Sequence, residues 1–132
     1  MRKKFVFAIV IVMLIGAGAL VYASSSDAPG SVEDPLVSKS YVDARMSFSS
    51  VELTEGQRLI GGDGTEIILR SGEATAIDNG YNGVADLTSG TDLMTGNQVG
   101  SNHLLLVPRA DGRGITAVTD IWVLVRGDYT IH

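Results

Sequence analysis

Two runs of apolar residues in the last third of the chain, separated by a polar turn, form the strongest pattern in the sequence. Leu104–Val107 and residues 121–125 (Ile-Trp-Val-Leu-Val) are short and rich in branched side chains. Runs of this length and composition predict buried strands rather than helices, which need longer segments with a 3.6-residue period. The segment between them, residues 109–114 (Arg-Ala-Asp-Gly-Arg-Gly), has the composition of a turn. The C-terminal part of the chain is therefore predicted to form paired extended strands.

Shorter apolar segments upstream repeat this pattern of strand and turn, with a turn signal every 8–12 residues or so. This spacing is typical of an all-β fold, here a small antiparallel β-sandwich or barrel, with a jelly-roll or cupin-like arrangement as one alternative. No long amphipathic helix is available to cover a parallel sheet, so the sequence argues against an α/β fold. Seven to nine strands are predicted, from the segments 48–53, 66–70, 73–77, 84–87, 92–94, 103–107, 115–118, 121–126 and 129–131.

Two segments of the predicted β-domain share one plan. Residues 65–77 and 102–118 each have a polar pair, three apolar residues, an arginine, a glycine turn, and then Ala-Thr-Ala-Ile or Ile-Thr-Ala-Val. Two similar hairpins are expected in a barrel or jelly roll with pseudo-twofold symmetry. The alternative is chance, because strands draw on few residue types.

The N-terminus has the three parts of a secretory signal. Residues 1–4 carry three positive charges, residues 5–20 are apolar, and Val21-Tyr22-Ala23 precedes a run of serines. We expect cleavage after Ala23. The alternative is an uncleaved anchor, because residues 5–23 are just long enough to cross a bilayer. Under both interpretations the folded domain is secreted or anchored at the outer face of the cytoplasmic membrane.

A polar linker and a short helix follow the N-terminal segment. Asp34 suits a helix N-cap and Pro35 suits the first helical position, so a helix is predicted over 35–46. A helix this short is marginal in water and needs a partner, either its own domain or copies of itself. The predicted organisation is therefore 1–23 signal or anchor, 24–47 linker with short helix, and 48–132 β-domain.

Charge and cysteine content exclude several functions. Without residues 1–4 the chain has seven Lys and Arg against fifteen Asp and Glu, a net charge of −8. Such an acidic chain is a poor partner for the phosphate backbone of nucleic acids. The absence of cysteine excludes disulfides, a thiolate metal site, a cysteine nucleophile and a lipid-modified cysteine.

One polar cluster is a candidate site: His103, Arg109, Asp111 and Arg113. A histidine beside carboxylates and arginines is suited to general-base chemistry or anion binding. The alternative is structural: His103 caps a strand, and Asp111 holds the turn by accepting backbone N–H bonds. Tyr81, in an Asn/Gly-rich loop, is the expected exposed aromatic for a ligand, whereas Trp122 is expected in the core.

Metal and cofactor chemistry have little support. The chain has two histidines, His103 and the terminal His132, and no metal-binding spacing of histidines. A cupin-like fold would therefore lack the usual metal ligands. Asp-Gly and Asn-Gly pairs near 62–64 and 78–80 are ordinary turn sequences rather than complete calcium loops. We predict no catalytic residue, no metal and no cofactor.

Two resemblances add to this picture. Residues 34–43 (DPLVSKSYVD) resemble the "TKxYVD" helix at the start of trimeric stalks in phage tail fibres, which implies a self-associating helix. Residues 64–72 (GTEIILRSG), 102–115 (NHLLLVPRADGRGI) and 125–131 (VRGDYTI) resemble a family of small exported proteins of Gram-positive, often spore-forming bacteria. That resemblance implies an extracytoplasmic location and brings no particular activity.

The expected function is a non-enzymatic module of the cell envelope or surface that acts through protein contacts, with another protein or with itself. The alternative is a module that binds a carbohydrate or small anion through Tyr81 and residues 109–113. A cupin-like or hydrolytic enzyme that uses His103 is a third hypothesis. The partners expected are thus a protein or a second copy, or a glycan, with no nucleic acid, and with a membrane only through residues 5–23.

Overall fold

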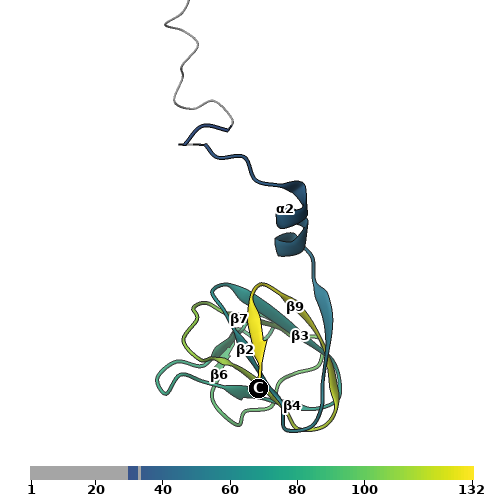
Figure 1. Ribbon diagram of the computed structural model, residues 1–132. Helices are drawn as coiled ribbons and strands as arrows, with labels where there is room; N and C mark the ends of the chain where they lie inside the picture. The colour runs from purple at the N-terminus through teal and green to yellow at the C-terminus, as the bar shows by residue number, and fades with distance from the viewer. Residues whose placement is uncertain (1–29, 33) are drawn as a thin grey trace, which may run out of the picture. The chain divides into compact units, whose positions relative to one another are not determined.

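A computed structural model describes residues 30–32 and 34–132 of the chain (Figure 1). By the contacts between its residues the chain divides after Lys39 into two units, and the second, Ser40–His132, contains all ten strands. The predicted signal or anchor at 1–23 lies outside the described residues. Within the described part of the chain, no helix has the length and apolarity to cross a membrane.

The prediction of an all-β fold is confirmed. Each predicted strand has a counterpart, and the structure adds β2, which the sequence does not predict. One short helix among the described residues, α2 (Lys39–Met46), precedes the strands. The strands are β1 (Ser49–Leu53), β2 (Arg58–Gly61), β3 (Thr65–Ser71), β4 (Ala74–Ile77), β5 (Val84–Asp86), β6 (Thr91–Leu93), β7 (Leu104–Val107), β8 (Gly114–Ala117), β9 (Ile121–Arg126) and β10 (Tyr129–Ile131).

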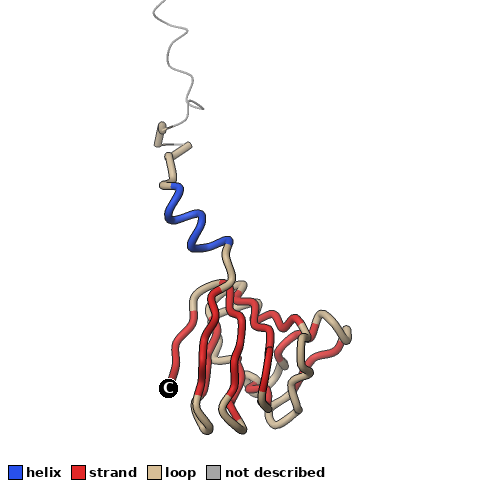
Figure 2. The backbone as a smooth tube through the Cα atoms, turned by 90° about the vertical axis from the view of Figure 1, so that its right-hand side faces the viewer, coloured by secondary structure: helices blue, strands red, loops and turns tan. Residues whose placement is uncertain are grey.

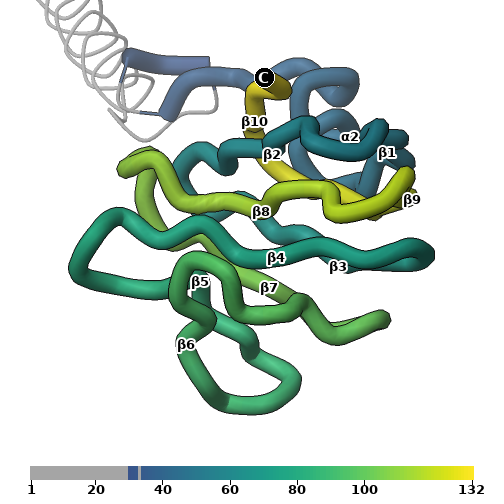
Figure 3. Tube along the Cα trace, turned by 90° about the horizontal axis from the view of Figure 1, so that it is seen from below, coloured from purple at the N-terminus to yellow at the C-terminus, as the bar shows by residue number. Residues whose placement is uncertain are grey.

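The strands form two antiparallel sheets, a β-sandwich (Figure 2). The six-stranded sheet has the order β1-β9-β3-β7-β5-β6 and the four-stranded sheet the order β10-β2-β8-β4. From β1 to β4, and again from β7 to β10, successive strands alternate between the two sheets. Residues 96–99 extend the smaller sheet beside β4, because Ala76 N donates to Asn97 O and Val99 N donates to Ala74 O, both at 2.9 Å. This alternation is the connectivity of a jelly roll. The β5–β6 hairpin lies at the opposite edge of the six-stranded sheet from β1 (Figure 3).

The core forms because alternate residues of each strand point between the two sheets. In β3 the buried and partly exposed positions alternate along Thr65–Ser71, and β9 follows the same rule. The large core side chains are all aliphatic. They are Val51, Leu53, Leu59, Ile67, Leu69, Val84, Val99, Leu105, Val107, Ile115, Ile121, Val123 and Val125.

The same alternation makes the prediction for Trp122 wrong. Its neighbours Ile121 and Val123 point into the core, so Trp122 lies on the outer face of the six-stranded sheet, where it is 47% exposed. A continuous apolar run does not reveal which of its residues face outward.

The repeated segments 65–77 and 102–118 are not hairpins, because each crosses from one sheet to the other. The first contains β3 and β4, and the second contains β7 and β8. The repeats pair with each other instead: Ile67 lies opposite Leu105 in one sheet, and Ala76 lies opposite Ile115 in the other. Antiparallel pairing of equivalent strands in both sheets relates the two repeats by an approximate twofold axis.

Helix α2 begins at Lys39, four residues later than predicted. Asp34 and Pro35 do not start a helix, because Asp34 takes part in a turn with the residues before it: Asp34 N donates to Ser31 Oγ at 3.0 Å, and Asp34 O accepts from Gly30 N at 2.7 Å. Ser38, a residue type common at N-caps, directly precedes the helix instead.

Candidate functional site

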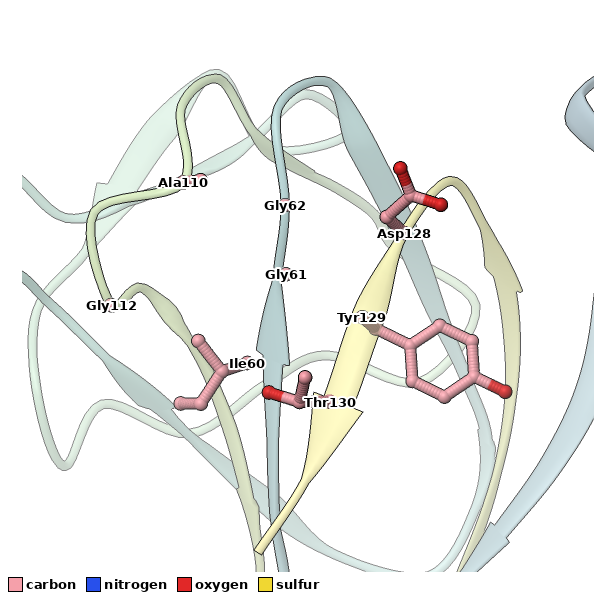
Figure 4. Close-up of a pocket in the computed structure, with 8 residues that line it drawn as sticks. All are labelled: Ile60, Gly61, Gly62, Ala110, Gly112, Asp128, Tyr129 and Thr130. Atoms are coloured by element: carbon pink, nitrogen blue, oxygen red, sulfur yellow. The ribbon is translucent and has the colours of Figure 1, made fainter.

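A pocket of about 270 Å³ lies on the outer face of the four-stranded sheet (Figure 4). Its floor is the end of β2, where Gly61 and Gly62 line the pocket. The loop that carries Ala110 and Gly112 lies on one side of β2, and the start of β10 lies on the other. The lining residues are Ile60, Gly61, Gly62, Ala110, Gly112, Asp128, Tyr129 and Thr130.

Arg113 holds the loop that forms one wall of the pocket. Its side chain is buried, with 5% of the residue exposed. Nε and one terminal nitrogen donate to the two carboxylate oxygens of Asp111, each at 2.9 Å, and the other terminal nitrogen donates to Gly83 O at 2.8 Å. Asp111 also accepts a hydrogen bond from Asn79 Nδ2 at 2.9 Å. Arg113 therefore connects its own loop to the loop at 78–83.

Contacts on both sides of β2 fix the pocket further. The carboxylate of Asp63 accepts from Ala110 N at 2.5 Å, which connects the turn after β2 to the loop. The backbone oxygen of Asp128 accepts from Thr65 Oγ1 at 2.6 Å, and its carboxylate accepts from the Arg45 side chain at 2.6 Å. The walls are thus held by side chains from distant parts of the sequence.

The lining determines what this pocket can do chemically. It offers glycine backbone, the side chains of Ile60 and Thr130, and one carboxylate, Asp128, which already has Arg45 as its partner. These groups suit binding of a small neutral ring or an apolar side chain. The hydroxyl of Thr130, one of the lining residues, lies 3.0 Å from Nε2 of His132, which does not line the pocket.

Of the predicted site residues, the structure brings Arg109, Asp111 and Arg113 together in one loop beside this pocket. Asp111 accepts hydrogen bonds from the Arg113 side chain. Arg109 is exposed at the same loop. Tyr81 is 90% exposed, as predicted, in the loop whose Asn79 contacts Asp111.

His103 does not belong to this group, because it precedes β7 whereas the loop with Arg109 follows β7. Its ring Nδ1 lies 2.7 Å from a carboxylate oxygen of Asp86, which is buried. The other carboxylate oxygen of Asp86 accepts the backbone N–H groups of Thr88 and Ser89, at 3.0 and 3.1 Å. The His103 side chain remains about one-third exposed. The pair ties the start of β7 to the end of β5.

The surroundings of Asp86 keep it ionised. Burial of this carboxylate by itself raises its pKa. The hydrogen bonds from the His103 ring and the Ser89 backbone outweigh burial and hold the pKa of Asp86 below its ordinary value. The Arg113 side chain is the main cause that lowers the pKa of Asp111. Both carboxylates are therefore charged acceptors at neutral pH.

The described residues contain no cluster of three or more side chains suited to hold a metal ion. In the segment that carries Asn-Gly, Asp78 accepts the backbone N–H groups of Gly80 and Thr95, at 2.7 and 2.8 Å. Asn79 accepts those of Tyr81 and Asn82, at 3.0 and 2.8 Å. The bonds from Gly80 and Tyr81, each two residues after the acceptor, are those of Asx turns, as the sequence predicted, whereas the bond from Thr95 joins two loops 17 residues apart.

Sequence reasoning missed Asp86, Asp63 and the pocket itself. A local signal existed for Asp86, because Asp-Leu-Thr-Ser-Gly is a turn sequence in which the first carboxylate accepts nearby N–H groups. Its contact with His103, and the contact of Asp63 with Ala110, join residues 17 and 47 positions apart. No spacing along the chain indicates such contacts.

Comparison with known proteins adds no relative: no protein-family model, no curated protein and no solved structure matches this chain.

Proposed function

We propose that this protein is a non-enzymatic module of the cell envelope or surface that acts through protein contacts. Helix α2 carries the proposal. None of its eight residues is buried, and its side chains at Val42 and Met46 are exposed apolar groups. A helix of this length is not stable alone in water, so its order and its apolar side chains are best accounted for by a partner.

The N-terminal sequence supports the location. Residues 1–23 have the pattern of a secretory signal or anchor, and the resemblance to exported proteins of Gram-positive bacteria agrees with it. The module is then secreted or held at the outer face of the cytoplasmic membrane.

The test is a double variant, Val42→Ser with Met46→Ser, in the chain from residue 24 onward, which contains the whole unit Ser40–His132. Self-association is measured by light scattering over a range of concentrations, and capture of envelope proteins by pull-down with the chain as bait. We expect the double variant to associate less than the unchanged chain, because the contacts made through α2 are lost. Val118→Ser is the matched control, because Val118 is equally exposed but lies after β8. Equal association of the double variant and the unchanged chain in both measurements contradicts the proposal.

A second candidate function is binding of a carbohydrate or small anion. The observation that favours it is the pocket beside the loop of Arg109, with exposed Tyr81 on the neighbouring loop. Arg113 is already bonded to Asp111 and Gly83, so Arg109 is the cation left for a ligand. A thermal-shift screen of monosaccharides, phosphate and sulfate tests this function. A ligand shift that disappears in Arg109→Ala supports it, and no shift with any compound in the screen contradicts it.

A further inference from the structure

The outer face of the six-stranded sheet carries a continuous apolar row. In the strand register, Leu124 of β9 lies opposite Ile68 of β3, and Ile68 lies opposite Leu104 of β7. All three side chains are partly exposed on the face away from the core. Trp122, which is more exposed, and Leu106 flank the row. We call Leu124, Ile68 and Leu104 the outer row.

This apolar face is unusual for an antiparallel sandwich, in which outward residues are ordinarily polar. The other sheet follows that rule: Arg58, Thr116 and Thr75 lie side by side on β2, β8 and β4. In β7, by contrast, both the inward and the outward residues are apolar, and in β9 the outward residues Trp122 and Leu124 are apolar whereas the third, Arg126, is charged. The continuous runs that first indicated buried strands therefore indicate a sheet that is covered on both faces.

The charges beside the outer row have a definite arrangement. On β3, Glu66 lies two residues before Ile68, and Arg70 lies two residues after it, at a β-bulge. On β9, Trp122 and Arg126 flank Leu124 in the same way. Arg126 donates to Glu66, whereas the exposed Arg70 makes no such contact with a described side chain. Arg70 and Trp122 therefore lie on one side of the row, and the ion pair of Glu66 and Arg126 lies on the other side.

This arrangement is complementary to itself. Rotation by 180° about an axis along the outer row, perpendicular to the strands, places the row of one copy on the row of another. The same rotation brings Arg70 over Glu66 of the second copy, and Trp122 over Arg126 of the second copy. An axis parallel to the strands would instead set Arg70 against Arg70 and Glu66 against Glu66. The contacts between Arg70 and Glu66 thus select one orientation, whereas the Arg126 guanidinium already lies over the Phe48 ring of its own chain.

We propose that the outer face of the six-stranded sheet is the interface of a symmetric homodimer, packed sheet against sheet across the outer row. This inference goes beyond the proposed function, because it names a second surface, apart from α2, and one partner, a second copy of the chain. Closed twofold dimers use the same patch on both subunits, and aligned sheets pack face to face through such side chains.

The test is the dimer dissociation constant of the chain from residue 24 onward, measured by analytical ultracentrifugation. We expect Arg70→Glu to weaken the dimer by at least about tenfold, because two opposite-charge contacts become like-charge contacts. Arg109→Glu is its control: it makes the same charge change at an exposed arginine beside the pocket. Ile68→Thr should weaken the dimer as strongly. Its control is Ile60→Thr, which makes the same change on the outer face of the other sheet.

Circular dichroism and thermal melting establish that each variant is folded. If Ile68→Thr does not fold, Arg70→Glu decides the question alone, because its side chain is exposed. A chain that stays monomeric at about 1 mM overturns the inference, and so does a dimer that Arg70→Glu leaves unchanged. If the Val42/Met46 variant loses association while Arg70→Glu does not, the proposed function stands and the sheet interface is wrong.

Discussion

Arg113 is the residue on which the loops beside the pocket depend most. Its guanidinium is buried, forms a two-pronged contact with Asp111 and reaches Gly83 O, so one side chain fixes two loops. A planar guanidinium group with several N–H donors is better suited to bond two loops at once than an ammonium group is. The sequence indicated Arg113 as a ligand-binding candidate, whereas the structure shows that its donors are used within the fold.

Replacement of Arg113 by alanine should lower the free energy of unfolding by about 3 kcal/mol, because a partly buried carboxylate and a carbonyl lose their donor. Arg113→Lys should recover little of this loss. Urea unfolding at neutral pH measures both. Arg109→Ala, at an exposed position in the same loop, should change stability by less than about 0.5 kcal/mol. Equal effects at Arg109 and Arg113 would show that burial of Arg113 does not matter.

Asp86 should make the fold sensitive to acid. Its pKa in the folded protein is below the ordinary value, so below a pH of about 4 the unfolded chain binds more protons than the folded one. The stabilisation from ionised Asp86 is therefore present at neutral pH and is lost as the pH falls through the folded pKa. The urea concentration at the midpoint of unfolding, measured from pH 3 to 7, should decrease as the pH is lowered. It should decrease less steeply in Asp86→Asn. Asp92→Asn, at an exposed carboxyl on β6, is the comparison. An identical acid slope in Asp86→Asn and the unchanged chain contradicts this role.

At the scale of elements, the crossover from β3 to β4 depends on Gly72. Its φ of 81° lies in the left-handed region, and an added Cβ would lie 2.4 Å from Asp120 O. Gly90 has a φ of 70° but open space around its Cα. The two glycines therefore separate the cost of backbone conformation from the cost of a clash.

Gly90→Ala should cost about 1 kcal/mol, the strain of a left-handed alanine. Gly72→Ala should cost clearly more, because the backbone of Asp120 must also move. Thermal melts of both variants give the comparison. Equal losses would mean that the turn relaxes freely around the new methyl group.

The strands and most turns were predictable because they depend on local chemistry: branched apolar runs, glycine corners, and Asp or Asn side chains that cap nearby N–H groups. The assignment of strands to sheets was not, and for that reason residues 65–77 were mistaken for a hairpin and Trp122 for a core residue. The pairing of His103 with Asp86 is likewise a consequence of topology, because β5 happens to lie beside β7. The start of α2 was misjudged because Asp34 found a competing turn with Ser31.

At the scale of the whole molecule, the described domain has a core of aliphatic side chains and carries its aromatic residues on the surface. Its polar clusters mainly hold loops and strand ends in place. Apolar side chains are also exposed on α2 and along the outer row, the two surfaces at which we propose protein contacts. The proposed function and the proposed dimer both depend on these exposed apolar side chains.

The most direct measurement is cross-linking through the outer row. The chain has no cysteine, so Leu124→Cys introduces a single reactive site. In a face-to-face dimer with its axis along the row, a short bismaleimide should join Leu124→Cys to its own counterpart and give a covalent dimer on a denaturing gel. Thr116→Cys, on the outer face of the other sheet, should stay monomeric under the same conditions. Equal cross-linking at both positions, or none at Leu124→Cys, would contradict the account.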